Sequence, residues 1–251
     1  MIAPSRQLLA GLLPNLRDCG GLGTADGKVL RDRLLLRSAA LVGLGPATLA
    51  AFIAAVGTGS YVDLRTDKEI ARDGAPRELI EAGWTWHRLP VSDGNTGDNV
   101  NLPVAPIADV LRRSLRAMPA YLDAARQVSQ MLGPRPVTVG CAVGKDRTGL
   151  VVAIVLQWLG IARAEILDDY ALSNTCLRSG RRLLPPRWHH KDHAIGLVDT
   201  SVCAAVLDQA AVTALPAAQA GANDLFVRSL TASQRAGRVS EHARAAAARR
   251  A

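Results

Sequence analysis

The chain has few aromatic residues and no long apolar run. Aromatic residues make up 4% of its 251 positions and are not interleaved with basic stretches, so we expect no nucleic-acid-binding surface. No uncharged apolar stretch reaches the ~18 residues of a membrane-spanning helix, so we expect no transmembrane segment. The amino terminus lacks a charged segment followed by an apolar one. This predicts a cytoplasmic protein, with secretion without a signal peptide as the alternative.

Cysteine is also scarce, and its four occurrences stand far apart. They are Cys19, Cys141, Cys176 and Cys203. They show neither zinc-ligand spacing nor a disulfide-rich pattern, which suits a reducing compartment. A His-His-x-x-His pattern at 189–193 is flanked by prolines and is not followed by a helix that would hold it rigidly. We therefore expect no metal and no cofactor.

The length and charge distribution predict one domain with a tail. With 49% hydrophobic residues and no internal repeat, the chain can bury one sizeable core. The net charge is +8, but residues 228–251 hold six arginines and one glutamate, so most of the excess lies there. We predict a domain over 1–225 and a basic Ala/Arg-rich tail over 226–251, which is either a solvated helix or a contact for acidic partners.

Apolar periodicity predicts several further elements. It favours helices at 46–56, 107–132 (broken near Pro119) and 194–215, and strands at 60–64 and 84–91. The strand at 60–64 places Asp63 and Arg65 at its carboxyl end, where sites in parallel sheets lie. A structural ion pair between these two residues is an equally good interpretation.

Residues 137–149 carry the most specific pattern in the chain. They read Val-Thr-Val-Gly-Cys-Ala-Val-Gly-Lys-Asp-Arg-Thr-Gly and are followed by the apolar segment 150–159. A β-branched run, a glycine-containing loop and an apolar helix are thus expected in succession. The spacing from Cys141 to Arg147 lets the loop amides and the guanidinium converge above the thiol. A phosphate dianion fits that position.

The residue types in this loop suit phosphoryl transfer through cysteine. A free thiol has a pKa of about 8.5, which a helix amino terminus and nearby cations lower to roughly 3.5–7.5. The Cys141 thiolate can then attack phosphorus and form a phosphocysteine, while Arg147 and the amides hold the equatorial oxygens. Asp146 is the first candidate for the general acid, and Asp93 and Asp98 are the alternatives.

Two other interpretations compete for this loop. A nucleotide-binding P-loop needs four residues between its glycines and a Ser or Thr after its Lys, whereas Gly140 and Gly144 enclose three residues and Asp146 follows Lys145. That interpretation fails on both counts. Cys141 as a small apolar residue at the end of a buried strand is the second interpretation.

The loop resembles the signature of cysteine-dependent protein tyrosine phosphatases, in particular the bacterial group with Gly-Lys-Asp-Arg-Thr-Gly, which includes broad-specificity mycobacterial members. Four further segments resemble that family in the same order: 15–21 (Asn-Leu-Arg-Asp-Cys-Gly-Gly), 35–41 (Leu-Leu-Arg-Ser-Ala-Ala-Leu), 62–65 (Val-Asp-Leu-Arg) and 169–174 (Asp-Tyr-Ala-Leu-Ser-Asn). The resemblance implies an α/β fold with a central, mostly parallel sheet flanked by helices. It also implies a metal-independent phosphatase.

The resemblance assigns roles to individual residues. Cys141 would be the nucleophile, Arg147 the phosphate clamp and Asp146 the acid. The expected substrate-binding residues are Ala142, Val143, Gly144, Lys145, Thr148, Asp63, Arg17 and Asp18. Lys145 is shared with lipid-directed phosphatases, which permits phosphoinositides as substrates. The expected substrate is a phosphotyrosine protein, a phosphoinositide or a small phosphorylated biosynthetic metabolite. The sequence does not choose among these, nor does it indicate an oligomeric state.

Two residues, Gly140 and Cys19, need separate comment. The family usually has His before the nucleophile, and this chain has Gly140. That change motivates a different function, a phosphatase fold that binds anions but turns over weakly, and a Gly140→His variant would then gain activity. Cys19 lies in a segment that runs near the signature loop in relatives, so the resemblance also implies a protective disulfide between Cys19 and Cys141 as an alternative to a filler role.

Overall fold

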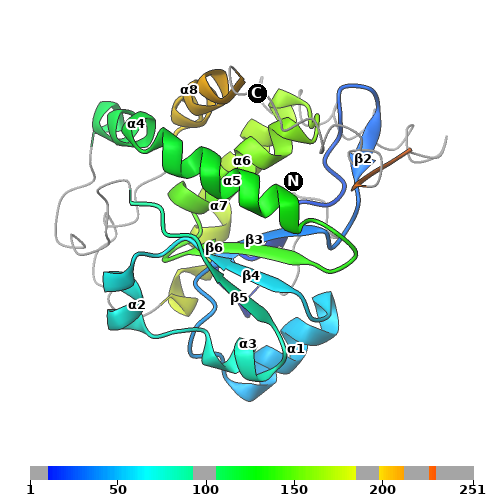
Figure 1. The fold of residues 1–251 in the computed structure, drawn as a ribbon, viewed down its shortest axis with the longest axis vertical. Helices are drawn as coiled ribbons and strands as arrows, with labels where there is room; N and C mark the ends of the chain where they lie inside the picture. The colour runs from blue at the N-terminus through cyan, green and yellow to red at the C-terminus, as the bar shows by residue number, and fades with distance from the viewer. Residues whose placement is uncertain (1–10, 93–105, 185–197, 212–225, 230–251) are drawn as a thin grey trace.

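The computed structural model describes residues 11–92, 106–184, 198–211 and 226–229 (Figure 1). Five strands form the main sheet. In sheet order they are β1 (Arg17–Asp18), β3 (Leu35–Ala39), β6 (Val137–Cys141), β4 (Ser60–Asp63) and β5 (Thr85–Arg88). β1 is antiparallel to β3, and all other neighbours are parallel. The predicted central, mostly parallel sheet is therefore confirmed.

Helices cover both faces of this sheet (Figure 1). One face packs against α1 (Pro46–Val56) and α3 (Arg77–Glu81). On the other face, α5 (Met118–Met131) and α6 (Asp146–Trp158) pack against the sheet, and α7 (Arg163–Gly180) and α8 (Thr200–Ala211) pack against α6. Three shorter elements complete this part of the chain: α2 (Asp67–Asp73), α4 (Ile107–Arg116) and the 3-10 turn η2 (Arg181–Leu183). No helix among the described residues is long and apolar enough to cross a membrane.

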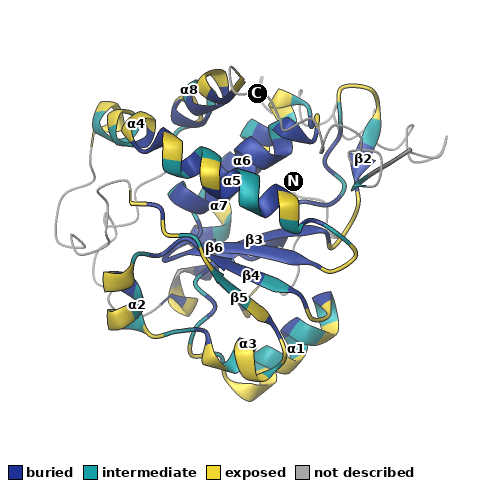
Figure 2. Ribbon diagram, viewed as in Figure 1, coloured by how far each residue is buried: buried dark blue, intermediate teal, exposed yellow. Residues whose placement is uncertain are grey.

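Burial on both faces explains why β6 and α6 are so apolar. Every residue of β6 is buried, as expected for a central parallel strand covered by helices on both sides (Figure 2). Val137 and Val139 face the core around α6, whereas the opposite face carries Leu36 and Tyr61. α6 is buried around nearly its whole circumference, which agrees with the prediction of a buried helix over 150–159.

The predicted elements agree with the structure apart from some boundaries. The helix at 46–56 and the strand near 60–64 are confirmed. The helical region 107–132 divides at Ala117, because Pro119 lies in the first turn of α5, where a missing N–H costs no hydrogen bond. The strand predicted over 84–91 is only β5. α8 lies inside the predicted 194–215, part of which is outside the described residues.

A small second sheet lies near the carboxyl-terminal end of the described residues. It pairs β2 (Lys28–Leu30) with β7 (Val227–Ser229) in antiparallel register. The backbone N–H of Arg31 also donates to the carbonyl oxygen of Phe226. Residues 230–251 lie outside the described part of the chain, so the division into 1–225 and 226–251 stays a prediction.

A buried charge cluster joins β1, β3 and α7. Arg17 Nε donates to Asp169 Oδ1 at 3.2 Å, and Arg37 Nη1 donates to Asp169 Oδ2 at 2.8 Å. Both guanidinium groups also donate to Ser173 Oγ. All three charged side chains are buried, and burial together with the charge of Arg37 lowers the pKa of Arg17. One carboxylate therefore balances two arginines.

We expect Asp169→Asn to lower the free energy of unfolding by about 3–5 kcal/mol, because it leaves two buried guanidinium groups without a counter-charge. Urea unfolding monitored by circular dichroism measures the loss. Asp168→Asn is the matched control, since it makes the same change on the same helix at an exposed position and should cost about 0–1 kcal/mol. Equal losses in the two variants would contradict this assignment.

Candidate active site

The signature loop lies at the carboxyl edge of the parallel sheet. β6 ends at Cys141 and α6 begins at Asp146, so the loop occupies the usual position for a site in such a sheet. Cys141 is buried, with 3% of its surface exposed. Gly144 needs to be glycine for two reasons: its φ is +71°, and a Cβ there would lie 2.2 Å from the carbonyl oxygen of Ser38.

The backbone carbonyl groups of the loop accept hydrogen bonds from two side chains, Asn15 before β1 and Arg37 on β3. Asn15 Nδ2 donates to the carbonyl oxygens of Val143 (3.2 Å) and Gly144 (2.7 Å). Arg37 Nη2 donates to the carbonyl oxygens of Gly144 (3.0 Å) and Lys145 (3.3 Å). C=O and N–H of a trans peptide point in opposite directions. The amides that follow these carbonyls, on residues 144–146, are thus turned toward the other side of the loop, where an anion would bind.

Arg147 is fixed by a carboxylate that the sequence analysis missed. Its Nη1 and Nη2 atoms donate to Glu69 Oε2 at 2.7 Å and Oε1 at 2.6 Å, a two-pronged ion pair. Nη1 also donates to the carbonyl oxygen of Leu64 at 3.3 Å. Burial alone would raise the pKa of Glu69, but the hydrogen bonds and charge of Arg147, with those of Thr66, hold it below its ordinary value. The guanidinium plane is therefore held in one orientation.

In the sequence, only a local helix-capping pattern marks Glu69. Thr66 and Glu69 form a capping box at the start of α2, in which each side chain bonds the other's backbone N–H. A Thr-x-x-Glu pattern predicts this helix start. It does not predict that the same carboxylate reaches Arg147, 78 positions along the chain.

Lys145 and Asp146 lie at the more exposed side of the loop. Lys145 Nζ is 2.9 Å from Asp146 Oδ1, and their side chains are 12% and 27% exposed. Thr148 is buried in the first turn of α6, and its hydroxyl has no partner among the described residues. The side chains of Ala142 and Val143 pack against Leu177 and Leu184, so these two residues can contact an anion only through their backbone groups.

Three predicted substrate-binding residues lie in the fold's interior instead. Arg17 is fully buried and bonds Asp169, Ser173 and Asn15. Asp18 accepts from the backbone N–H groups of Gly20 and Arg33, at 2.8 and 2.7 Å. Because their polar atoms bind protein groups, we interpret Arg17 and Asp18 as supports and not as substrate contacts.

Asp63 is the third such residue. Its Oδ2 is 2.6 Å from Arg65 Nη2, both side chains are fully buried, and Arg65 Nη2 also donates to the carbonyl oxygen of Gly74. Burial alone would lower the pKa of Arg65, but the hydrogen bonds and charge of Asp63 outweigh it and raise that pKa. Of the two alternatives for this pair, the geometry supports the structural ion pair.

The disulfide between Cys19 and Cys141 is wrong for this fold. Cys19 N–H donates to the carbonyl oxygen of Leu35, at the start of β3, whereas Cys141 is paired with Ala39, at the end of β3. Four residues of strand span about 13 Å. A disulfide requires Cα atoms roughly 4.4–6.8 Å apart. Neither cysteine forms a disulfide, and Cys19 is buried in the core.

Several predicted groups cannot be placed. Asp93, Asp98 and the histidines at 189–193 lie outside the described residues. Within the described ranges, no three His, Cys, Asp or Glu side chains gather as they would around a metal ion.

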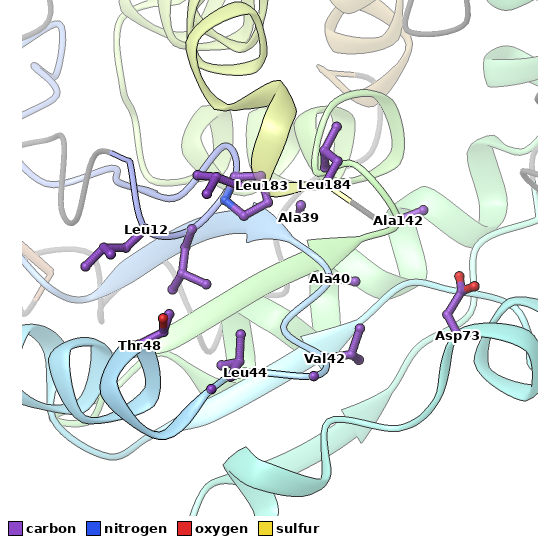
Figure 3. A pocket seen from close by; sticks show the side chains of 14 residues that line it. Leu12, Ala39, Ala40, Val42, Leu44, Thr48, Asp73, Ala142, Leu183 and Leu184 are labelled. Atoms are coloured by element: carbon purple, nitrogen blue, oxygen red, sulfur yellow. The ribbon is translucent and has the colours of Figure 1, made fainter. Parts of the chain in front are cut away.

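A cavity of about 280 Å³ adjoins the loop at Ala142 (Figure 3). Most of its lining side chains are apolar, while polar atoms contribute about half of its surface; the lining comes mainly from the residues before β1, the segment after β3 and the end of η2. Leu12, Val42 and Leu184 are among these, and Asp73 is the charged side chain among the lining residues. The apolar part of a substrate could extend from the loop into this space.

We expect the Glu69–Arg147 pair to stabilise the protein in a pH-dependent way. Because the Glu69 pKa is lowered on folding, its contribution is present above the unfolded value of about 4.3 and is lost as pH falls through the folded pKa. Glu69→Gln should therefore cost about 3 kcal/mol at pH 7 and progressively less below about pH 4. Urea unfolding from pH 7 to pH 3 measures this, with exposed Glu81→Gln as control. A pH-independent cost would show that the charge is not responsible.

Comparisons with known proteins agree with this site. A family model described as the tyrosine phosphatase family matches residues 10–233. The triple specificity protein phosphatase PtpB of Mycobacterium tuberculosis is 31% identical over 191 residues, which cover 64% of this chain and 66% of that protein. A Cupriavidus necator protein named as a tyrosine-protein phosphatase is 26% identical over 174 residues, covering 64% of this chain and 61% of that protein. The chain thus matches slightly less than two thirds of either relative.

Solved structures show more distant similarity. A Neisseria meningitidis protein described as a phosphatase is 21% identical, with a TM-score of 0.36 and coverage of 61% of this chain and 92% of that one. The kinase associated phosphatase is 15% identical, with a TM-score of 0.41 and coverage of 61% and 81%. Since the family model spans most of its length, the chain belongs to the tyrosine phosphatase family.

Proposed function

We propose that this protein is a metal-independent phosphomonoester hydrolase that uses Cys141 as nucleophile and a phosphocysteine as intermediate. The observation that carries this proposal is the loop between β6 and α6. Its carbonyl oxygens accept hydrogen bonds from Asn15 and Arg37, and Arg147 is paired with Glu69. Its cysteine is the last residue of β6, where the loop begins. Such preorganised donors stabilise charge without reorganising during the reaction.

In the first step the phosphoryl group binds to the loop amides and to Arg147. The Cys141 thiolate attacks phosphorus opposite the leaving oxygen, so the S–P bond forms as the P–O bond breaks. Asp146 donates a proton to the departing oxygen, which leaves as an alcohol or phenol. Its carboxyl is 27% exposed beside Lys145, so it can reach a leaving group on the solvent side.

In the second step water replaces the sulfur. The Asp146 carboxylate accepts a proton from the attacking water, the S–P bond breaks, and inorganic phosphate leaves while the thiolate re-forms. The balance is one phosphomonoester and one water consumed for one alcohol and one phosphate. Every proton transfer uses the same carboxyl group, so no metal is needed to activate the water.

The proposed substrates are phosphotyrosine proteins, phosphoinositides and small phosphorylated metabolites. Lys145 favours highly anionic groups, and the cavity beside Ala142, whose lining side chains are mostly apolar, can accept an aromatic or acyl portion. Similarity to a phosphatase named for triple specificity supports a broad range. We place the reaction in the cytoplasm. A weakly active anion-binding module is the second candidate, and Gly140 motivates it.

We expect Cys141→Ser to lower phosphate release by at least about a thousandfold, because it removes the nucleophile. Release is measured with p-nitrophenyl phosphate, a phosphotyrosine peptide and a phosphoinositide in the presence of a chelator. Cys176→Ser is the matched control and should retain the native rate. If the native chain binds phosphate or vanadate tightly but releases nothing from all three substrates, the anion-binding module is correct.

We expect Asp146→Asn to lower kcat/KM by about 10²–10⁴ for phenyl or alkyl phosphates, whose leaving groups need a proton. The loss should be much smaller for p-nitrophenyl phosphate, whose leaving group is stable as an anion. A series of aryl phosphates with different leaving-group pKa values measures this dependence. Asp123→Asn, an exposed change on α5, serves as control. A uniform loss across the series would assign the acid to another residue.

A further inference from the structure

Position 140, directly before the nucleophile, has no room for a side chain. A Cβ atom at Gly140 would lie 2.7 Å from the hydroxyl oxygen of Tyr61, 2.8 Å from its Cε2 atom and 3.2 Å from the carbonyl oxygen of Ala39. Asp63 is opposite Gly140 in the β4–β6 register and Tyr61 is opposite Thr138, so Tyr61 and Gly140 share one face of the sheet. The φ angle of Gly140 is not positive. The tyrosine ring, together with the Ala39 carbonyl oxygen, therefore requires glycine here, and the backbone conformation of Gly140 does not.

Tyr61 also reaches the segment on which the loop rests. Its side chain is fully buried, and its hydroxyl oxygen accepts a hydrogen bond from the backbone N–H of Leu41 at 3.3 Å. Leu41 follows Ser38 and Ala39, whose backbone atoms lie so close to Gly144 that they exclude a Cβ there. One phenol thus contacts the residue before Cys141 and holds the chain that backs the loop.

The surroundings of Tyr61 keep it a neutral hydrogen-bonding group. Burial raises its pKa well above the ordinary value, and the nearby charges of Asp63 and Arg65 act in opposing directions. The apolar cluster that contains the Tyr61 ring also contains Leu36 from β3, Phe52 from α1 and Leu79 from α3. Tyr61 therefore remains protonated at neutral pH.

We propose that Tyr61 is a positioning residue for Cys141, and that Tyr61 and Gly140 are a matched pair in which the phenol occupies the place of the usual side chain before the nucleophile. Gly140 is then a packing requirement and not a sign of lost activity. The kinetic consequence rests on the proposed phosphatase function. The consequences for thiol reactivity and for stability do not.

The pair makes predictions opposite to those of a decayed site. Gly140→His alone should clash with the phenol, lower the melting temperature and reduce activity. Adding Tyr61→Val to that variant should open space for the imidazole and recover much of both. Tyr61→Phe keeps the ring but leaves the buried Leu41 N–H without its partner, so it should lower kcat about fivefold with KM unchanged.

The experiment measures three quantities for each variant. These are the alkylation rate of Cys141 by iodoacetamide at fixed pH, followed by peptide mass spectrometry, the kcat and KM for p-nitrophenyl phosphate, and the melting temperature. Tyr121→Phe is the matched control, because Tyr121 is equally buried but lies on α5. It should change stability without changing the alkylation rate. Tyr61→Phe should slow alkylation about fivefold, in parallel with kcat.

Three results would overturn the proposal. These are native alkylation and kcat in Tyr61→Phe, an activity gain without loss of stability in Gly140→His, or a double variant no better than Gly140→His. If the native chain shows no turnover, the proposed function fails. The alkylation rates and melting temperatures then test the proposed pairing of Tyr61 with Gly140 without any kinetic data.

Discussion

Asp169 lies between two buried arginines, and hydrogen bonds connect both arginines to the signature loop. Arg37 bonds Asp169 on one side and the carbonyl oxygens of Gly144 and Lys145 on the other. Arg17 bonds Asp169 and Asn15, and Asn15 in turn bonds the carbonyl of Gly144. The orientation of the loop amides thus depends on a carboxylate in α7, the helix that follows α6 in the chain. The buried charges are tolerated because they are paired and hydrogen-bonded.

Arg147, at the other end of the loop from Cys141, is likewise a buried charge that is compensated by a paired side chain. Arg147 would be a costly charge at 7% side-chain exposure, and Glu69 compensates it through two hydrogen bonds. On the opposite face of β6, a neutral phenol takes the space beside Gly140. Charged, polar and steric contacts from three separate segments therefore converge on a loop of few residues. Such convergence is what a preorganised phosphate site requires.

Sequence reasoning succeeded where the signal was local. The run 137–149 predicted a strand, a loop and a helix, and β6 and α6 confirm all three. It was less successful where distant segments meet. Glu69 could be identified only as a capping residue, and Arg17 and Asp18 were expected at the substrate but lie among protein partners. The disulfide that was one of two alternatives for Cys19 would join it to a cysteine at the other end of a strand. Each of these depends on which strands are neighbours, which a short pattern does not encode.

The sequence by itself determined the type of site, because a thiol, an arginine fork and loop amides at one spacing suit one kind of ligand. It also determined which segments are buried, since apolar periodicity follows the geometry of helices and strands. Only the tertiary structure decided which side chains support the loop and why residue 140 is glycine. The strand order β1-β3-β6-β4-β5 places Arg37 behind the loop and Tyr61 beside Gly140. Close packing then leaves no volume for a second side chain.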